Sequence, residues 1–410
     1  MTVGTSPPSV FEADLPPLNY EPTETPAAVY PRIQAAQRQA PVAMGPFGPE
    51  VLSYRLVRAV LRDIRFTIPP GLNLVVQGIT SGPLWDKVTN SLLCLQGDAH
   101  QRLRSLTSKA FTPRATLRLH DIMVAVMNDL VDQVAAEGRC DVVDDLARPY
   151  PVPIICALLG APREDWQRFS AWADEIFKAF SFIAGVSDIE AAVMRAWGEL
   201  DDYVDEMVTR RRHSLTEDLL SDLIRAEDDG DRLDSAELRM LAGGLLLAGT
   251  DTTRNQLAAS VRVLCAHPDQ WALLAERPEL AMGAVEETMR HSPIACGTLR
   301  LVTEDVELDG YLFPAGTMIL VNTAAANRDP SVYEQPERVD ITRAGAPAIL
   351  TFGGGVHYCL GANLARRELA DALTVLTGRL RNPRIAGPAP WKPMVSLSGP
   401  LCLPLEFDQP

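Results

Sequence analysis

The longest continuous helical pattern in the chain begins at Asp234 and ends before Pro268. Asp234 and Glu237 are spaced as in a capping box, and apolar residues then recur with helical periodicity. Roughly 33 residues at ~1.5 Å each give a helix of about 50 Å, long enough to cross the whole molecule. A chain with such a helix has to build the rest of its core around it.

The middle of this helix contradicts its own propensity. Residues 245–253 read Leu-Leu-Leu-Ala-Gly-Thr-Asp-Thr-Thr, so a glycine and three β-branched threonines cluster within one helix. The Thr252 hydroxyl can donate to the Ala248 carbonyl one turn back and open a groove, and Gly249 permits close approach of a ligand. Such an inconsistency is expected at a functional site. The alternative is a helix bent for packing, with Asp251 at the surface.

A glycine-rich loop leads into a second helix and carries one cysteine. Residues 351–361 read Thr-Phe-Gly-Gly-Gly-Val-His-Tyr-Cys-Leu-Gly. Glycines at 353, 354, 355 and 361 permit positive φ and a tight fold beneath a large flat ligand. The free N–H groups and the dipole of the helix start favour the thiolate form of Cys359. We therefore expect Cys359 to be an anion.

A thiolate in this position has several possible uses. A nucleophile needs a base, and His357 is near in sequence, although a tight loop does not ensure that the two face each other. A redox pair needs a second cysteine close by, and zinc needs three further ligands. An axial thiolate to haem iron needs only this cysteine. From the residues alone, haem ligation and a buried structural cysteine both remain open.

The string Phe352-Gly-x-Gly-x-His357-x-Cys359-Leu-Gly361 resembles the haem-binding signature of the cytochrome P-450 family in its bacterial soluble form. The resemblance extends over about residues 30–405. It implies a mostly helical α+β fold of triangular outline, with a large helical region and a smaller β-rich region. Haem b would lie between the long helix and the helix that follows Cys359. The implied metal ligand is Cys359, and the implied cofactor contacts in these two stretches are Phe352, His357, Gly361, Ala248 and Gly249.

The stretch Ala248-Gly-Thr-Asp251-Thr252-Thr is similar to the acid–alcohol motif of the same family. The resemblance implies that Thr252 hydrogen-bonds the bound dioxygen while Asp251 passes protons inward through water. General acid catalysis of this kind promotes cleavage of the O–O bond.

Two further arginines match family positions that contact the haem propionates. His100 and Arg104 lie four residues apart, so a helix places them on one face, where a solvated pair is the alternative. Residues 97–99 read Gly-Asp-Ala where many relatives carry Asp-Pro-Pro, so the approach to that helix differs. Arg300 matches the contact to the second propionate. Short strands are expected at residues 306–308, 311–313 and 318–321.

Glu287 and Arg290 resemble the E-x-x-R pair of the family, which is buried beneath the haem loop. The stretch Pro336-Glu-Arg-Val resembles the family's P-E-R-F, with valine in place of phenylalanine. Arg338 is therefore the expected third member of this group. We assign all three residues to the scaffold and not to the chemistry.

Residues 66–93 form an apolar stretch rich in proline and glycine. Long apolar loops are unusual unless they cover something, and in the family this stretch roofs the substrate pocket; an irregular packing loop is the alternative. The pocket residues implied in this way are Val76, Leu245, Ile294, Ala295, Thr298 and Leu397. Because the pocket segments are chiefly apolar and carry no evident charged anchor, we expect a neutral lipophilic substrate.

Composition narrows the biological setting. A net charge of −15 argues against nucleic acid or an anionic membrane as the main partner. Seven scattered cysteines without C-x-x-C pairs are typical of a reduced, cytoplasmic protein, and no secretory signal or membrane span is readable. Residues 1–28 are expected to be a flexible N-terminal segment before a single domain over residues 29–410.

The resemblance implies a monooxygenase that inserts one atom of O₂ into a C–H bond or an alkene. Because no flavin or ferredoxin domain follows, electrons are expected from a separate ferredoxin and an NAD(P)H-dependent reductase. Arg366 and Arg367 are candidate docking charges, with a solvated helix face as the alternative. A peroxide-driven peroxygenase is less favoured because Asp251 and Thr252 are present. A non-catalytic haem-based sensor is the alternative from another class.

Overall fold

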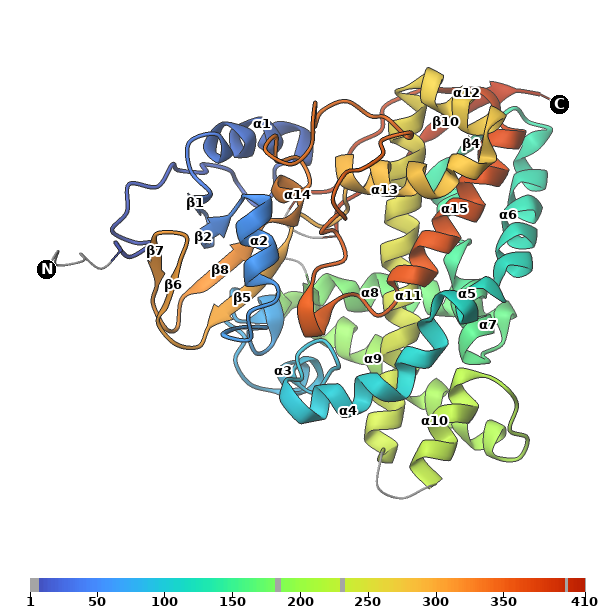
Figure 1. Cartoon of the computed structure of the whole chain (residues 1–410). Coiled ribbons are helices and arrows are strands. Elements are labelled where there is room, and N and C mark those ends of the chain that lie inside the picture. Colours follow the sequence, from blue (N-terminus) through green and yellow to red (C-terminus); the bar gives the residue numbers. More distant parts are fainter. Residues whose placement is uncertain (1–6, 181–185, 229–232, 395–396, 410) are drawn as a thin grey trace, which may run out of the picture.

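The computed structural model describes residues 7–180, 186–228, 233–394 and 397–409. Figure 1 shows a β-rich region on one side of the molecule and a helical region on the other. Helix α11, Ser235–Cys265, runs through the helical region. The predicted capping box is confirmed, since Asp234 Oδ1 accepts the Glu237 N–H at 2.8 Å and Glu237 Oε2 accepts the Asp234 N–H at 3.1 Å.

Four other helices surround α11 and bury it. It packs against α7 (Pro151–Leu159), α8 (Trp166–Ile176), α9 (Val186–Arg212) and α15 (Ala362–Arg379). One large apolar cluster joins these helices, and α11 contributes buried leucines to it along most of its length. The helix therefore occupies the centre of the core, as its length predicts.

The remaining helices lie around this centre and at the border of the β-rich region. They are α1 Pro26–Gln37, α2 Tyr54–Val60, α3 Pro83–Thr89, α4 Gly97–Ser108, α5 Pro113–Leu117, α6 His120–Ala135, α10 Leu219–Asp228, α12 Pro268–Glu276, α13 Ala281–His291 and α14 Thr323–Ala326. Short 3-10 segments are Leu72–Leu74, Lys109–Phe111, Arg163–Asp165, Phe177–Phe180, Pro278–Leu280 and Gly355–His357, and Val142–Ala147 is a π-helical turn.

The main sheet has five strands in the order β1-β2-β8-β5-β3. Their bounds are β1 Val42–Gly45, β2 Gly48–Val51, β8 Met318–Val321, β5 Thr298–Val302 and β3 Phe66–Thr67. The β2–β8 pair is parallel and the other pairs are antiparallel. In the β5–β8 register Thr298 lies opposite Val321 and Arg300 lies opposite Ile319. Arg300 therefore lies on an inner strand of the sheet, between β8 and β3.

Two smaller sheets complete the β structure. Strands β4 (Arg139–Asp141), β10 (Pro404–Asp408) and β9 (Arg381–Ile385) form an antiparallel sheet against the helical region. Strands β6 (Val306–Leu308) and β7 (Tyr311–Phe313) form a hairpin. The three short strands predicted between residues 306 and 321 are confirmed with the same bounds.

The N-terminal stretch differs from the loosely attached segment that composition predicted for residues 1–28. Within residues 7–25, Val10, Leu18 and Tyr20 are buried in the two apolar clusters beneath the sheet. Leu18 N–H also donates to the Met44 carbonyl at 2.8 Å. Burial of these three apolar side chains against the sheet orders the stretch, although its proline-rich composition favours a flexible chain.

A search of the described residues finds no helix that is both long enough and apolar enough to cross a membrane.

Candidate functional site

The cysteine loop closes on itself immediately before α15. Cys359 N–H donates to the Phe352 carbonyl at 2.9 Å. Gly353 and Gly355 have φ of 73° and 64°, in the left-handed region that favours glycine. A Cβ on Gly355 would lie 2.4 Å from the carbonyl oxygen of Leu61, at the end of α2. The loop is therefore pressed between the end of α2 and the start of α15.

Two of the four loop glycines do not need left-handed backbone. Gly354 is extended, with φ of −165°, and Gly361, the N-cap of α15, has an ordinary φ of −81°. The prediction that the glycines permit positive φ is thus confirmed at positions 353 and 355 only. Gly361 has open space around the position of a Cβ, so its backbone conformation does not require glycine.

The electrostatics of Cys359 differ from the sequence prediction. The residue is exposed, but its sulfur is crowded by the surrounding chain. Desolvation raises the pKa of the Cys359 thiol and outweighs the Gly361 N–H and the charges of Arg104 and Arg366, which lower it. The helix start therefore does not by itself make Cys359 an anion. A coordinated metal ion deprotonates a thiol outright, so the anion belongs to the ligated state.

Four basic side chains converge beside this loop. His100 and Arg104 lie one turn apart on α4, as predicted, and the His100 ring is 4.3 Å from the ring of His357. Arg104 donates to the Tyr358 carbonyl, and His357 Nε2 lies 3.2 Å from Gln96 Oε1. Burial, followed by the charges of His100, Arg300 and Arg104, lowers the pKa of His357 to about 4.

This cluster fits a ligand with two carboxylates. Arg300 is 4% exposed, and its guanidinium donates to Thr298 Oγ1 at 2.9 Å and to the Leu299 carbonyl at 2.8 Å. Burial lowers the pKa of Arg300 to about 10. Among the described residues no carboxylate pairs with Arg300, and a buried charge without a counter-ion is costly. The propionates of haem b, bound through Cys359, would supply the missing negative charges.

Helix α11 carries the predicted hydroxyl. Thr252 Oγ1 donates to the Ala248 carbonyl at 2.9 Å, which confirms the predicted bond. The helix nevertheless remains continuous through this turn. A Cβ on Gly249 would lie 2.8 Å from Ile155 Cγ1, so the need for glycine there comes from close packing against α7. On the side where a side chain would project, Gly249 therefore allows the close packing of α11 against α7, and the predicted approach of a ligand to Gly249 stays a prediction.

Asp251 is buried and ion-paired, not at the surface. It forms an ion pair with Arg254, one turn later on α11, and Arg254 also pairs with Asp174 on α8. Asp174 in turn pairs with Arg148. The side-chain exposures of these four residues are 6%, 11%, 27% and 39%, so the row of alternating charges leads outward from Asp251 to solvent.

The structure brings several of the predicted pocket residues together. Ser398 N–H donates to the Ile294 carbonyl at 2.7 Å, which places the tail that contains Leu397 beside residue 294. Ile294 is buried, whereas Ala295 and Thr298 are half-buried. The other two predicted pocket residues belong to separate apolar clusters: Val76 packs against the cluster beneath the sheet, and Leu245 belongs to the helical one.

The predicted roof, residues 66–93, is anchored to the helical region. Lys87 on α3 forms an ion pair with Asp201 on α9, and its ammonium lies 5.8 Å from the centre of the Trp197 ring. Gln77 Nε2 donates to the Ala179 carbonyl at 3.4 Å. These contacts tie the stretch to α9 and to the segment Phe177–Phe180.

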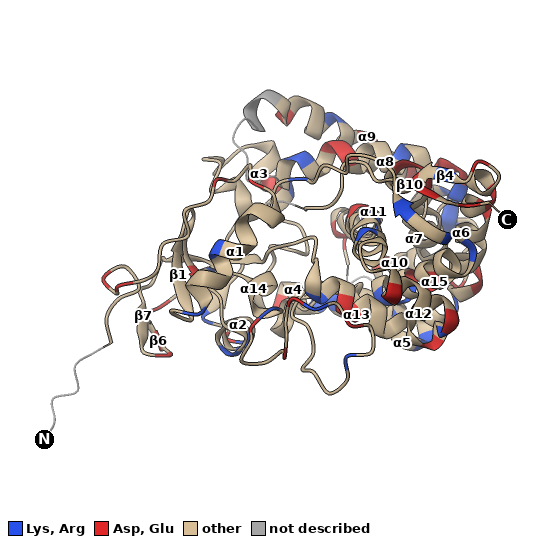
Figure 2. Cartoon of the chain, turned by 90° about the horizontal axis from the view of Figure 1, so that it is seen from above, with Lys and Arg blue, Asp and Glu red and all other residues tan. Residues whose placement is uncertain are grey.

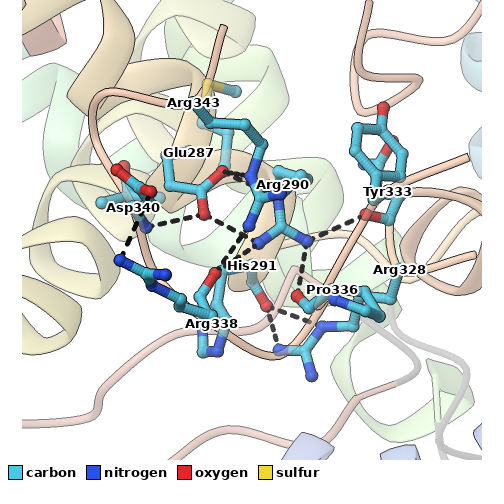
Figure 3. Close-up of polar contacts among 12 residues, drawn as sticks. Glu287, Arg290, His291, Arg328, Tyr333, Pro336, Arg338, Asp340 and Arg343 are labelled. Atoms are coloured by element: carbon cyan, nitrogen blue, oxygen red, sulfur yellow. Dashed lines mark hydrogen bonds and ion pairs between the residues drawn. The ribbon is translucent and has the colours of Figure 1, made fainter. Parts of the chain in front are cut away.

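The scaffold arginines differ in part from the prediction, as Figure 3 shows. Arg290 pairs with Glu287 through Nε and one terminal nitrogen, both at 2.8 Å, and both side chains are buried. The third charged partner is Arg343, whose Nε lies 3.2 Å from Glu287 Oε2. Arg338 contributes its carbonyl, which accepts from Arg290 at 3.2 Å, while its side chain is 63% exposed. The prediction of Arg338 as the third side chain is therefore wrong.

The two arginines expected to dock a partner are engaged within the chain. Arg366 forms an ion pair with Glu286 on α13, and Arg367 pairs with Asp371 and contacts His120 on α6. Neither guanidinium is free to act as the docking charge that the sequence suggested.

Sequence reasoning missed Arg254 and Arg343. Arg254 had a local signal, since it follows Asp251 at the same i, i+3 spacing that singled out Glu287 and Arg290. Arg343 had none, because it lies on an irregular segment whose path depends on the packing of the loop against α13.

The fold and the site together define a haem-thiolate protein, with one cysteine loop, a basic cluster for two carboxylates and a central helix carrying Asp251 and Thr252. A family model for cytochrome P450 matches residues 86–381, and the chain belongs to the cytochrome P450 family.

Curated relatives agree with this assignment. The chain is 36% identical to luteothin monooxygenase of Streptomyces thioluteus, over 92% of each chain. It is 39% identical to mycinamicin IV hydroxylase/epoxidase of Micromonospora griseorubida, over 88% of this chain and 91% of the relative.

Solved structures show the same fold. CalO2 superposes with a TM-score of 0.89 at 32% identity, over 96% of this chain and 99% of the other. P450BioI, solved with acyl carrier protein carrying hexadec-9Z-enoic acid, has a TM-score of 0.85 at 29% identity, over 92% and 98%. The chain is therefore a monooxygenase that takes haem b and consumes O₂.

Proposed function

We propose that this protein hydroxylates or epoxidises a neutral lipophilic molecule with electrons from a separate ferredoxin and an NAD(P)H-dependent reductase, in the cytoplasm. The observation that carries the O₂-dependent reading is the pair Asp251 and Thr252 on α11, with Asp251 connected to solvent through ionic partners. A site driven by peroxide alone has no need for a route that delivers protons.

Each described residue has a distinct part in this proposal. Haem b, when bound, supplies the iron at which oxygen is reduced. Cys359 ligates that iron, and His100, Arg104, Arg300 and His357 hold the two carboxylates by charge-assisted hydrogen bonds. Thr252 Oγ1 donates its proton to the Ala248 carbonyl, so its oxygen lone pairs can accept a hydrogen bond from a water.

Proton delivery begins at the buried ion pair. Asp251 forms an ion pair with Arg254, and a turn of its side chain away from Arg254 would carry a proton toward Thr252. Arg254 stays compensated during this movement because Asp174 also pairs with it, and Asp174 is held by Arg148. The outward gradient of exposure lets solvent protons reach the row without opening the substrate pocket.

The electron donor is proposed to dock around the cysteine loop. Exposed cations there form no ion pair within the part of the chain that the structure describes: Arg58, Arg62, Lys109, Arg114 and Arg118. Arg62 abuts Gly355, and Asn363 Nδ2 on α15 donates to the Phe111 carbonyl between Lys109 and Arg114. Figure 2 shows basic positions on α2, the helix that carries Arg58 in its last turn. A surface of this charge suits an acidic ferredoxin.

The substrate class follows from the apolar residues Ile294, Leu299, Val76 and Leu245 and from the absence of a charged side chain among the predicted pocket residues. Relatives named for luteothin and mycinamicin IV, and the acyl carrier protein bound to P450BioI, suggest screening natural products and carrier-bound acyl chains. A spectral screen that follows the haem Soret band from low to high spin would identify binders.

The decisive experiment compares product formation with ferredoxin, reductase and NADPH against product formation with peroxide alone. Faster turnover with the electron-transfer system supports the proposal. Efficient turnover with peroxide alone favours a peroxygenase, and ligand binding without turnover in either system favours a sensor. Tight binding restricted to small, highly charged compounds would overturn the substrate class.

A further inference from the structure

Arg366 lies about one turn into α15 and contacts two residues of the loop that precedes Cys359. Its guanidinium carbon lies 4.4 Å from the centre of the Phe352 ring. Its Nη1 donates to Tyr358 Oη at 3.0 Å, and its Nε forms an ion pair with Glu286 on α13. Phe352 and Tyr358 begin and end the turn that Cys359 N–H closes on the Phe352 carbonyl. The Arg366 side chain therefore contacts the first residue of this turn and the residue directly before Cys359.

The two side chains of the Arg366–Glu286 ion pair differ in their exposure to solvent. The Arg366 side chain is 17% exposed, whereas the Glu286 side chain is 36% exposed. Water screens an exposed charge more strongly than a buried one. The cysteine loop therefore lies beside a positive charge that water screens less than it screens the paired negative charge.

We propose that Arg366 is a positioning residue that holds Phe352 and Tyr358 around Cys359, and that its charge helps set the reduction potential of the bound haem. The proposal rests on the haem ligation by Cys359 that is part of the proposed function, and it does not depend on the identity of the substrate or the electron donor.

The sign of the effect follows from charge. Reduction adds one electron to the haem-thiolate centre, so a fixed positive charge nearby stabilises the ferrous state and raises the potential. The Arg366 guanidinium lies over the Phe352 ring, and a cation over an aromatic face is attracted to it. Loss of Arg366 should therefore lower the potential and release the ring together.

The experiment measures the haem midpoint potential by spectroelectrochemistry in four single variants of the holoprotein. Arg366→Gln should lower the ratio of ferrous to ferric haem at a fixed potential by about tenfold, which is 59 mV for a one-electron couple. Glu286→Gln, which removes the compensating anion and keeps Arg366, should shift the ratio in the opposite direction. Arg366→Lys should keep most of the potential but lose the planar contact with Phe352.

Arg367→Gln is the matched control. Arg367 neighbours Arg366 in sequence, but it pairs with Asp371 and faces α6, so its removal should leave the potential unchanged. The reduced carbon-monoxide spectrum of each variant checks that the thiolate remains bound.

Opposite shifts for Arg366→Gln and Glu286→Gln, with the thiolate spectrum retained, would support the proposal, because a merely structural loss moves both variants in the same direction. Equal shifts in one direction, or no shift in Arg366→Gln, would overturn it. If Arg366→Gln loses the thiolate spectrum, the midpoint potential of Arg366→Lys becomes the test. A potential near the native value supports the charge effect. A fall as large as that expected for Arg366→Gln contradicts it.

Discussion

Arg343 Nε lies 3.2 Å from Glu287 Oε2, so one buried carboxylate is shared by Arg290 on the same helix and by an arginine from a distant loop. The Asp340 N–H also donates to Glu287 Oε1 at 2.9 Å. These bonds fasten the segment that follows Pro336 to α13. The resulting scaffold holds the chain that leads into the cysteine loop.

Substitution of Arg343 should therefore destabilise the protein, while substitution of Arg338 should not. Arg343→Gln removes a charge-assisted bond to a buried carboxylate, which costs about 1.5–3 kcal/mol. Arg338→Gln changes an exposed side chain whose nearest ionic partner, Asp340, is 3.7 Å away. Urea unfolding of the two holoproteins provides the measurement. Equal midpoints for the two variants would contradict the assignment of Arg343.

Removal of the Asp251 carboxylate should slow turnover without weakening substrate binding. For Asp251→Asn we expect kcat to fall about 10²-fold or more, since general acid catalysis contributes about that much. Asp174→Asn should give a smaller fall, because it weakens the outer part of the charge row. Asp121→Asn, on the exposed first turn of α6, is the control. Measurements of kcat and of spectral dissociation constants separate an effect on turnover from an effect on substrate binding. An unchanged kcat in Asp251→Asn would contradict the proposed proton route.

Arg300 should matter for haem retention. Arg300→Leu removes a buried guanidinium without a carboxylate partner, and a lost charge-assisted bond of about 1.5–3 kcal/mol corresponds to about 10- to 100-fold faster haem loss. Transfer of haem to an excess of an apoprotein acceptor measures the rate. Arg55→Leu is a control, since Arg55 pairs with Asp309 in the β-rich region. The same rate in both variants would argue that Arg300 does not hold the haem.

Stability should fall between pH 5 and pH 8 because of Glu50. Burial raises the pKa of Glu50 to about 7 despite hydrogen bonds from Tyr20 Oη at 2.6 Å and Asn322 Nδ2 at 3.1 Å. The folded-state value exceeds the ordinary 4.5, so this stabilisation is fully present below pH 4.5 and is lost as the pH rises through 7. The largest possible loss is roughly 3 kcal/mol.

Glu50→Gln should remove this part of the pH dependence. Urea midpoints at pH 5 and pH 8, compared between the variant and the native protein, give the measurement. Burial also raises the pKa of Glu368 to about 8, but both proteins retain that group, so the difference between them isolates Glu50. Identical pH dependence in the two proteins would contradict the prediction.

The docking face should respond to charge removal. Arg114→Gln and Arg118→Gln should each raise the KM for ferredoxin several-fold and reduce its dependence on ionic strength, because exposed charges act mainly on the association rate. Chemical reduction by dithionite should be unaffected. Arg367→Gln is the internal comparison, since its side chain is paired. A larger effect for Arg367→Gln would restore the docking role that the sequence suggested for it.

Much of the site was predictable because its signals are local. His100 and Arg104 needed only a helix to share a face, and the bond from Thr252 to Ala248 follows from helical geometry. The short strands of β6, β7 and β8 were readable from alternation and turn residues. The pKa of Cys359 was not predictable in this way, because desolvation by distant segments outweighs the local helix start.

The amino-acid order alone predicted a glycine-rich loop that carries Cys359 to the start of a helix, the acid and alcohol of α11, and one helix that spans the core, since each depends on spacing within a single element. Only the packed molecule decided that Arg343 and not Arg338 completes the scaffold, that Gly249 serves the contact with Ile155, and that Arg366 faces the cysteine loop. Those outcomes depend on which surfaces of distant elements meet. The free energy of burying side chains over the whole core determines which surfaces pack together. No local pattern of residues contains that information.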